Sequence, residues 1–170
     1  MATQITRRGF LRGSTPDIVF KPIRPPGASS SAFEDLCINC TACHDSCPET
    51  IIAVDSAGRP WLDFTIGACT FCGSCSEVCP TGALRPENVE DWAWQAVFND
   101  TCMSVNGIAC RICQDACEPR AISFRLQTGG CAVPVLDAAS CTGCGACASV
   151  CPTQSVHYER PSDDHRDAVA

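Results

Sequence analysis

The sequence predicts an α+β fold in which two small modules follow one another along the chain. The first observation is a unit of eight cysteines that occurs twice and includes most of the 17 cysteines in 170 residues. The second is that each unit contains two short apolar runs around a glycine-containing turn, as in a β-hairpin. The third is the short stretch between the last two cysteines of each run, where we expect short helices. Duplication of a whole unit indicates a repeated supersecondary structure.

The cysteines follow one spacing, C-x2-C-x2-C-x3-C-P, in three runs that begin at Cys37, Cys69 and Cys141. A fourth run begins at Cys102 and has seven residues before its second cysteine. This spacing is that of bacterial ferredoxins, where it binds [4Fe–4S] clusters. We therefore predict four [4Fe–4S] clusters on two tandem bacterial-type 2[4Fe–4S] ferredoxin modules.

The spacing also predicts which cysteines share a cluster. Three cysteines separated by two residues bind three corners of one cube, and the fourth binds the other cluster of the pair. The predicted ligand sets are Cys37, Cys40, Cys43 and Cys79; Cys69, Cys72, Cys75 and Cys47; Cys102, Cys110, Cys113 and Cys151; and Cys141, Cys144, Cys147 and Cys117. Because the loop of residues 103–109 alters solvent access, we expect the Cys102 set to have the most divergent reduction potential.

Disulfides and zinc are the alternative interpretations of so many cysteines. Disulfide frameworks occur in short secreted chains but do not repeat a triple of closely spaced cysteines. Zinc sites use pairs of cysteines with a longer gap between pairs. Two further residues are expected to have ordinary roles: His44, since four cysteines already serve its run, and Cys131, which lies outside all four sets.

Hairpins are predicted at residues 51–54 with 60–64 and at residues 121–126 with 132–137. Apolar residues alternate over 92–98, which predicts a strand that opens the second module. We divide the chain into a basic, flexible arm at residues 1–31, a first module at 32–86, a second module at 87–159 and a polar, flexible tail at 160–170.

Charge and composition exclude several function classes. The formal net charge is −7, and cluster thiolates would make it more negative, so nucleic acid is not an expected partner. The sequence has no apolar run close to the roughly 20 residues that a membrane helix needs. It shows no nucleophile–base pair and no phosphate-binding loop, so we do not expect an enzyme.

The arm contains TRRGFLR at residues 6–12, which looks like a twin-arginine export signal. An export signal continues with an apolar region of about 7–15 residues. Here the chain continues with GSTPD at residues 13–17. We therefore expect a cytoplasmic protein that is not exported, with an arm that either is disordered or docks on a partner.

The sequence resembles the NapF family of ferredoxin-type accessory proteins. The resemblance rests on RRGFLRG at residues 7–13, IRPP at 23–26, the order of the four runs, and CRICQDACEPRAI at 110–122. It covers nearly the whole chain except the C-terminal end. It implies four [4Fe–4S] clusters and a cytoplasmic role in maturing the catalytic subunit of periplasmic nitrate reductase before export, by cluster insertion or reduction. The precursor of that subunit would be contacted by the basic residues Arg7, Arg8, Arg12, Lys21 and Arg24.

Two other functions remain open from the residues alone. The number of predicted clusters favours an electron-transfer ferredoxin or subunit that relays electrons between a donor and a reductase. A sensor of oxygen or redox state, whose clusters switch a partner, is the third hypothesis.

Overall fold

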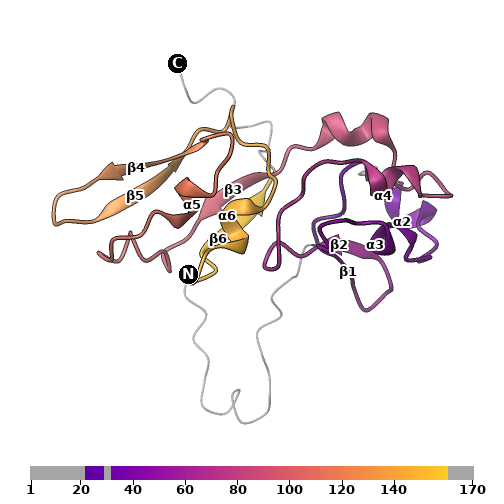
Figure 1. Cartoon of the computed structure of the whole chain (residues 1–170), viewed down its shortest axis with the longest axis horizontal. Helices are drawn as coiled ribbons and strands as arrows, with labels where there is room; N and C mark the ends of the chain where they lie inside the picture. Colours follow the sequence, from indigo (N-terminus) through magenta and orange to yellow (C-terminus); the bar gives the residue numbers. More distant parts are fainter. Residues whose placement is uncertain (1–21, 29–31, 161–170) are drawn as a thin grey trace, which may run out of the picture.

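The computed structural model describes residues 22–28 and 32–160. The elements of the two modules gather at opposite ends of the long axis, with the first module at the right in Figure 1 and the second at the left. Within the described residues, no helix is long and apolar enough to cross a membrane.

The first module consists of short helices around one hairpin. Its elements are α2 (Phe33–Leu36), α3 (Ala42–Asp45), β1 (Ile52–Val54), β2 (Pro60–Leu62) and α4 (Ser74–Glu77). Strands β1 and β2 pair antiparallel, with Ile52 opposite Leu62. The turn between them is closed by Asp55, whose Oδ1 accepts hydrogen bonds from the main-chain N–H groups of Ala57 and Arg59. The predicted hairpin is confirmed.

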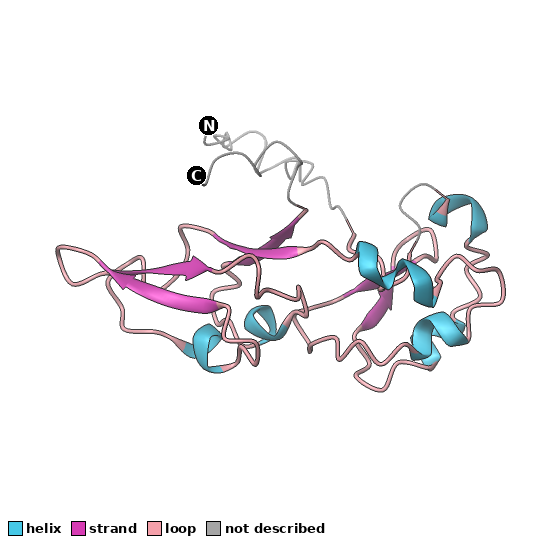
Figure 2. Cartoon of the chain, turned by 90° about the horizontal axis from the view of Figure 1, so that it is seen from above, coloured by secondary structure: helices cyan, strands magenta, loops and turns pink. Residues whose placement is uncertain are grey.

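The second module repeats this plan and adds a second pair of strands. Its hairpin and helices are α5 (Ile112–Asp115), β4 (Ile122–Leu126), β5 (Ala132–Leu136) and α6 (Ala146–Ser149). Strands β4 and β5 pair antiparallel over five positions, which confirms the second predicted hairpin. Seen from above in Figure 2, the strands of this module lie along one side and its two helices along the other.

A connector joins the modules and opens the second pair of strands. The 3-10 helix η1 (Pro86–Asp91) leads into β3 (Gln95–Phe98), which pairs antiparallel with the last strand, β6 (Val156–Glu159). The predicted alternation holds from Trp94 onward, since Trp94 and Ala96 are buried and Val97 is exposed. The strand begins three residues later than the pattern suggested, because η1 ends only at Asp91 and the pairing with β6 stops at Gln95 opposite Glu159.

The helices have only one turn because the cysteine runs interrupt them. Helices α3, α4 and α6 follow residues in the left-handed region, Thr41 (φ 61°), Gly73 (φ 84°) and Gly145 (φ 95°). Glycine adopts this conformation without a steric penalty, which explains its presence at two of the three positions. Each of these residues lies inside a cysteine run, so the bend sends the third cysteine onto the start of the helix.

Each module has its own hydrophobic core, and the two cores share side chains. The first core is built from residues such as Phe33, Ile51, Leu62, Phe64 and Leu84. The second is built from Ala96, Cys113, Ile122, Cys147 and Val156. Ala148 and Tyr158 pack against both cores, so the modules form one continuous packed body.

Residues 22–28 differ from the predicted flexible arm, because they pack against the first module. The main-chain N–H of Leu62 donates to the carbonyl of Ile23 at 2.8 Å, and Pro25 is fully buried. Arg24 donates to Asp55, Glu34 and the carbonyl of Pro60, each at 3.0 Å. The prolines keep this stretch extended, and the carboxylates of the module hold its arginine in place. The rest of the predicted arm, residues 1–21 and 29–31, lies outside the described residues, as does the tail beyond residue 160.

Candidate iron–sulfur sites

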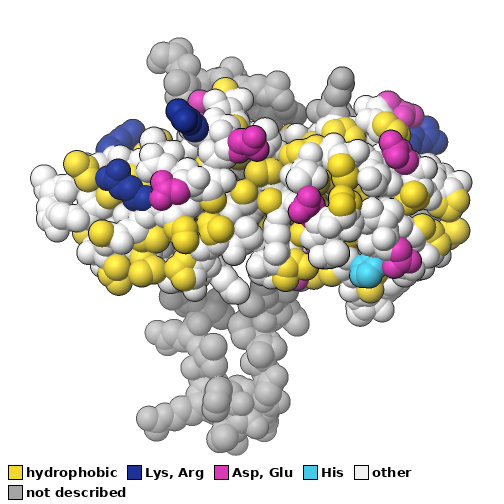
Figure 3. All heavy atoms as spheres, viewed as in Figure 1, with side chains coloured by type: hydrophobic (Ala, Val, Ile, Leu, Met, Phe, Trp, Pro, Cys, Tyr) yellow, Lys and Arg dark blue, Asp and Glu magenta, His cyan; other side chains and the backbone are white. Residues whose placement is uncertain are grey.

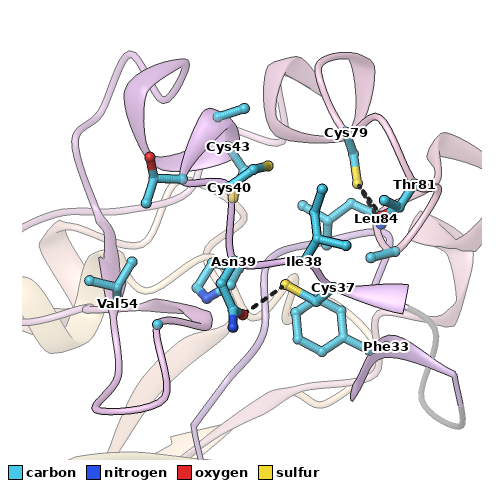
Figure 4. Close-up of a pocket in the computed structure, with 15 residues that line it drawn as sticks. Phe33, Cys37, Ile38, Asn39, Cys40, Cys43, Val54, Cys79, Thr81 and Leu84 are labelled. Carbon is cyan, nitrogen blue, oxygen red and sulfur yellow. Dashed lines mark hydrogen bonds between the residues drawn. The ribbon is translucent and has the colours of Figure 1, made fainter. Parts of the chain in front are cut away.

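Three of the four predicted ligand sets each line one pocket. Figure 4 shows the first pocket, where Cys37, Cys40 and Cys43 approach from the segment before and within α3 and Cys79 approaches from beyond α4. The rest of its lining is largely apolar and includes Phe33, Ile38, Val54, Pro60 and Leu84. Including the part open to solvent, this hollow encloses about 410 Å³.

The second module has two such pockets. One is lined by Cys102, Cys110, Cys113 and Cys151, and the other by Cys141, Cys144, Cys147 and Cys117. Their volumes, again including the open part, are about 310 and 320 Å³. In both, three cysteines come from one run and the fourth comes from the other run of the module.

The remaining set consists of Cys69, Cys72, Cys75 and Cys47, and its other three cysteines lie near Cys75. Burial is the main cause that raises the pKa of Cys75, to about 12, and the nearby charges of Cys69, Cys72 and Cys47 raise it further. The charge of Cys43 from the first set also acts on Cys75. Cys113 and Cys147 interact across the corresponding boundary of the second module. Within each module, the two sets are therefore immediate neighbours.

Several cysteines of the four sets are buried enough that their thiols do not ionise readily without a positive charge nearby. Burial raises the pKa of Cys43, Cys69 and Cys147 to about 11 and that of Cys113 to about 12. A buried thiolate is unfavourable unless a positive charge compensates it. Iron ions at the centre of each set would provide that charge, so these sites suit a metal cluster better than free thiols.

Hydrogen bonds to sulfur recur at the cysteine that crosses between runs. In three runs, a main-chain N–H four or five residues later points back at this sulfur. The bonds are Leu84 to Cys79 (3.4 Å), Ala121 to Cys117 (3.2 Å) and Ser155 to Cys151 (3.3 Å). Such donors stabilise a thiolate and tune a cluster bound to it. At Cys79 and Cys151, hydrogen bonds lower the pKa even though burial, the largest single cause, acts to raise it.

The cysteine runs lie close to the surface. Hydrophobic side chains are visible over both modules in Figure 3, with charged side chains scattered among them. Several exposed hydrophobic residues are in or beside a cysteine run: Ile38, Ile66, Val78, Ile108 and Ile112. Cys40 and Cys72 are themselves exposed. A partner can therefore approach these sites closely.

The side chains of two residues outside the sets, His44 and Cys131, have neighbours of their own. His44 is about half exposed, and its Nδ1 lies 3.0 Å from Asp45 Oδ1. Cys131 follows the turn of the β4–β5 hairpin, near Gly107. All 17 cysteines lie within the described residues and are free.

The sequence analysis missed the contact between modules and its aromatic residues. The main-chain N–H of Cys69 donates to the carbonyl of Cys144 at 2.7 Å. This bond connects the set that contains Cys69 in the first module with the set that contains Cys144 in the second. Trp92 packs against the first core and donates from Nε1 to the carbonyl of Thr142 at 3.0 Å. The Tyr158 hydroxyl lies 3.4 Å from Cys147 Sγ. Only the alternation of apolar residues around the last strand signals Tyr158 in the sequence.

These sites fit the group that the cysteine spacing predicts. Three of them place four sulfurs around one largely apolar pocket, and main-chain donors point at a sulfur in each of these three. These are the ligands and surroundings of a protein-bound [4Fe–4S] cluster. Residues 36–83 and 108–155 both match the family model described as a 4Fe-4S dicluster domain. The chain is thus an iron–sulfur protein of the ferredoxin type, with two tandem dicluster domains.

Comparison with known proteins identifies the family. The ferredoxin-type protein NapF of Escherichia coli strain K12 is 36% identical over 160 residues, which cover 94% of this chain and 97% of that protein. NapF of Haemophilus influenzae is 35% identical, with 89% and 92% covered. The methylamine utilization ferredoxin-type protein MauM of Methylophilus methylotrophus is 32% identical, with 88% and 75% covered. The chain belongs to the NapF family of ferredoxin-type proteins.

Proposed function

We propose that the chain holds four [4Fe–4S] clusters and uses them to assist maturation of the periplasmic nitrate reductase catalytic subunit in the cytoplasm. The observation that carries the proposal is that sixteen of the seventeen cysteines fall into four sets of four, three of them around a shared pocket. The family resemblance supplies the partner. The chain itself is not an enzyme: it binds the unexported subunit and supports insertion or reduction of that subunit's cluster.

The residues around each site have separate tasks in this function. A [4Fe–4S] cluster supplies reversible one-electron reduction when it is bound. The sulfurs fix its position, the apolar lining limits water, and donors such as the Leu84 and Ala121 amides stabilise negative charge on sulfur. The exposed Cys40 and Cys72 bring two sites to the surface, where a partner can exchange electrons.

The predicted basic docking residues need one correction. Arg24 is bound to the carboxylates of Asp55 and Glu34 within the first module, and its side chain is only 16% exposed. It therefore supports the fold and is withdrawn from the docking set. Arg7, Arg8, Arg12 and Lys21 lie outside the described residues and remain the proposed contacts for the precursor.

Anaerobic co-purification tests this function. The catalytic subunit is offered to the holoprotein both as the precursor with its export signal and as the mature form. We expect binding to the precursor, and loss of at least about tenfold in affinity when Arg7, Arg8, Arg12 and Lys21 are all replaced by alanine, since each charge contributes modestly. Replacement of the exposed Arg85 and Arg120 is the control and should leave binding unchanged. Absence of binding to both forms would refute the maturation role.

A general electron-transfer function is the second candidate. The main-chain hydrogen bond between Cys69 and Cys144 favours electron transfer, because this bond brings the site that contains Cys69 into contact with the site that contains Cys144. In this case the fourfold alanine variant would still pass electrons from dithionite to a reductase at the wild-type rate. The maturation function instead predicts that this variant is reduced normally by dithionite but fails to activate the precursor.

A further inference from the structure

The boundary between the modules contains one tyrosine that contacts a cluster ligand. Tyr158 lies in β6, and its hydroxyl is 3.4 Å from Sγ of Cys147, a buried cysteine at the start of α6. A cysteine bound to iron is a thiolate and can only accept a hydrogen bond, so the tyrosine must be the donor. A tyrosine hydroxyl has an ordinary pKa of about 10, so it carries its proton at neutral pH and can donate to the sulfur.

The first module holds this tyrosine in place. The rings of Phe64 and Tyr158 are 4.8 Å apart between centroids and tilted by 52°. Phe64 is itself buried and belongs to the first core, whereas Tyr158 packs against both cores. Aromatic pairs at this separation are stabilising beyond the area that they bury. The position of the hydroxyl in the second module thus depends on a ring supplied by the first.

The ligand loop that leads to Cys147 is fixed by the same contact. Gly145, two residues before Cys147, lies directly against the Phe64 ring, with no room for a side chain. The main-chain hydrogen bond from Cys69 to Cys144 holds the loop one residue earlier. The sulfur and the hydroxyl are therefore both positioned by the first module.

We propose that Tyr158 is a positioning residue through which the first module sets the reduction potential of the site formed by Cys141, Cys144, Cys147 and Cys117. A hydrogen bond to a ligand sulfur stabilises the more negative, reduced state, so the tyrosine raises this potential. The proposal rests on the proposed cluster ligation and does not depend on the nitrate reductase partner.

The test is an EPR-monitored redox titration of the full-length holoprotein under anaerobic conditions. Tyr158→Phe removes the hydroxyl and keeps the ring. We expect one of the four midpoint potentials to fall. The equilibrium constant for one-electron reduction of that site should decrease by about threefold to tenfold, which is the range of a single hydrogen bond. Tenfold corresponds to 59 mV. His157→Gln is the control, since this neighbour on β6 is exposed and should leave all four potentials unchanged.

A second pair of measurements separates the hydroxyl from its support. Phe64→Leu leaves Tyr158 intact but removes the ring beneath it, and should lower the same potential. Tyr158 is the single tyrosine of the chain, so growth on 3-fluorotyrosine labels this position alone. Fluorine makes the phenol a stronger donor, and the same potential should then rise.

The outcomes distinguish the parts of the proposal. Unchanged potentials in Tyr158→Phe, with the iron content of the wild type, would overturn it. If Tyr158→Phe loses iron, the fluorotyrosine protein decides: an unchanged potential there refutes the proposal and a raised one supports it. A shift in Tyr158→Phe without one in Phe64→Leu would refute control by the first module. Iron content measured on the same samples reports separately on the cluster ligation, and binding of the nitrate reductase precursor is not involved.

Discussion

Gly145 of the second module lies in contact with the Phe64 ring of the first, and a Cβ atom at this position would overlap that ring. Gly145→Ala should therefore weaken the packing between modules. Positive φ alone destabilises alanine by about 1 kcal/mol, and overpacking adds about 1–3 kcal/mol. Anaerobic urea unfolding of the holoprotein measures the loss. Limited proteolysis at residues 86–94 should show the connector cut faster.

The matched control is Gly73→Ala. Gly73 has the same role before α4 and a similar φ of 84°, but nothing lies within 4 Å of its Cβ position. It should lose only the conformational part, about 1 kcal/mol. Equal losses in the two variants would mean that the Phe64 contact contributes nothing to stability.

Arg24 should stabilise the first module although the sequence places it in the arm. Arg24→Ala removes three hydrogen bonds and a guanidinium 5.2 Å from the centre of the Phe33 ring. We expect the free energy of unfolding to fall by about 2–3 kcal/mol. Arg85→Ala is the control: its side chain is 53% exposed and lies 3.9 Å from Glu87, so the loss should stay below about 1 kcal/mol. If the free energy of unfolding falls less in Arg24→Ala than in Arg85→Ala, residues 22–28 do not stabilise the first module as described.

Asp55 should contribute a stabilisation that does not vary with pH between 5 and 8. Hydrogen bonds, chiefly from the Arg59 main-chain N–H and also from Arg24, hold the pKa of this carboxyl below its ordinary value of 3.8. Since the folded-state pKa is lowered, the stabilisation is fully present above pH 3.8 and is lost only as the pH falls through the lowered value. Asp55→Asn should thus reduce stability by about 1–2 kcal/mol equally at pH 5 and pH 8. Guanidinium unfolding at both pH values checks this, and unequal losses at pH 5 and pH 8 would show that the carboxyl titrates between them, which a lowered pKa excludes.

The crossing of ligands between runs can be tested by alanine substitution. Cys79→Ala and Cys37→Ala should abolish the same EPR signal, because the two sulfurs line one pocket. Cys69→Ala should abolish a different one. Iron content should fall from about sixteen atoms per chain to about twelve in each variant. If Cys79→Ala instead matches Cys69→Ala, each run binds its own cluster and the crossed assignment is wrong.

The site that includes Cys102 should have the most divergent potential of the four. Cys102 is buried, and its loop is fixed by hydrogen bonds from Ser104 to the Ala132 carbonyl and from Asn106 to the carbonyls of Asp100 and Cys102. These bonds replace the short turn of the other runs and change the dipoles around the sulfur. Redox titration followed by EPR, with Cys102→Ala to assign the signal, measures this. Four indistinguishable potentials would refute the expectation.

The hairpins were predictable because their signal is local: a glycine-containing turn between two apolar runs. The cysteine spacing also predicted three groups of four cysteines that each line one pocket. Ligation of clusters by the four sets stays a prediction. The exclusion of His44 from the sets rests on stoichiometry and stays a prediction. The 3-10 helix η1 was not predicted, since Pro86–Asp91 precedes the apolar pattern that begins at Trp92 and has no such pattern of its own.

The features that escaped prediction depend on residues far apart in the sequence. Arg24 forms an ion pair with Asp55, and the residues of β3 pair with residues of β6 that are 58 to 64 positions later, from Phe98–Val156 to Gln95–Glu159. The pairing of Phe64 with Tyr158 is of the same kind. Neither periodicity nor spacing carries information on such contacts, because they are set by how two finished units fit together.

The pairing of β3 with β6 has a consequence for how the chain is made. Strand β3 is synthesised early in the second module and stays without its partner until residue 159 has left the ribosome exit tunnel. The Tyr158 and Ala148 side chains that pack against the first core are also synthesised late, as is Cys144, whose carbonyl accepts from Cys69. Strand β6 therefore closes this sheet only after both cysteine runs of the second module have been synthesised, and a chain that lacks residues 156–159 would leave the edge of β3 open to pairing with another chain.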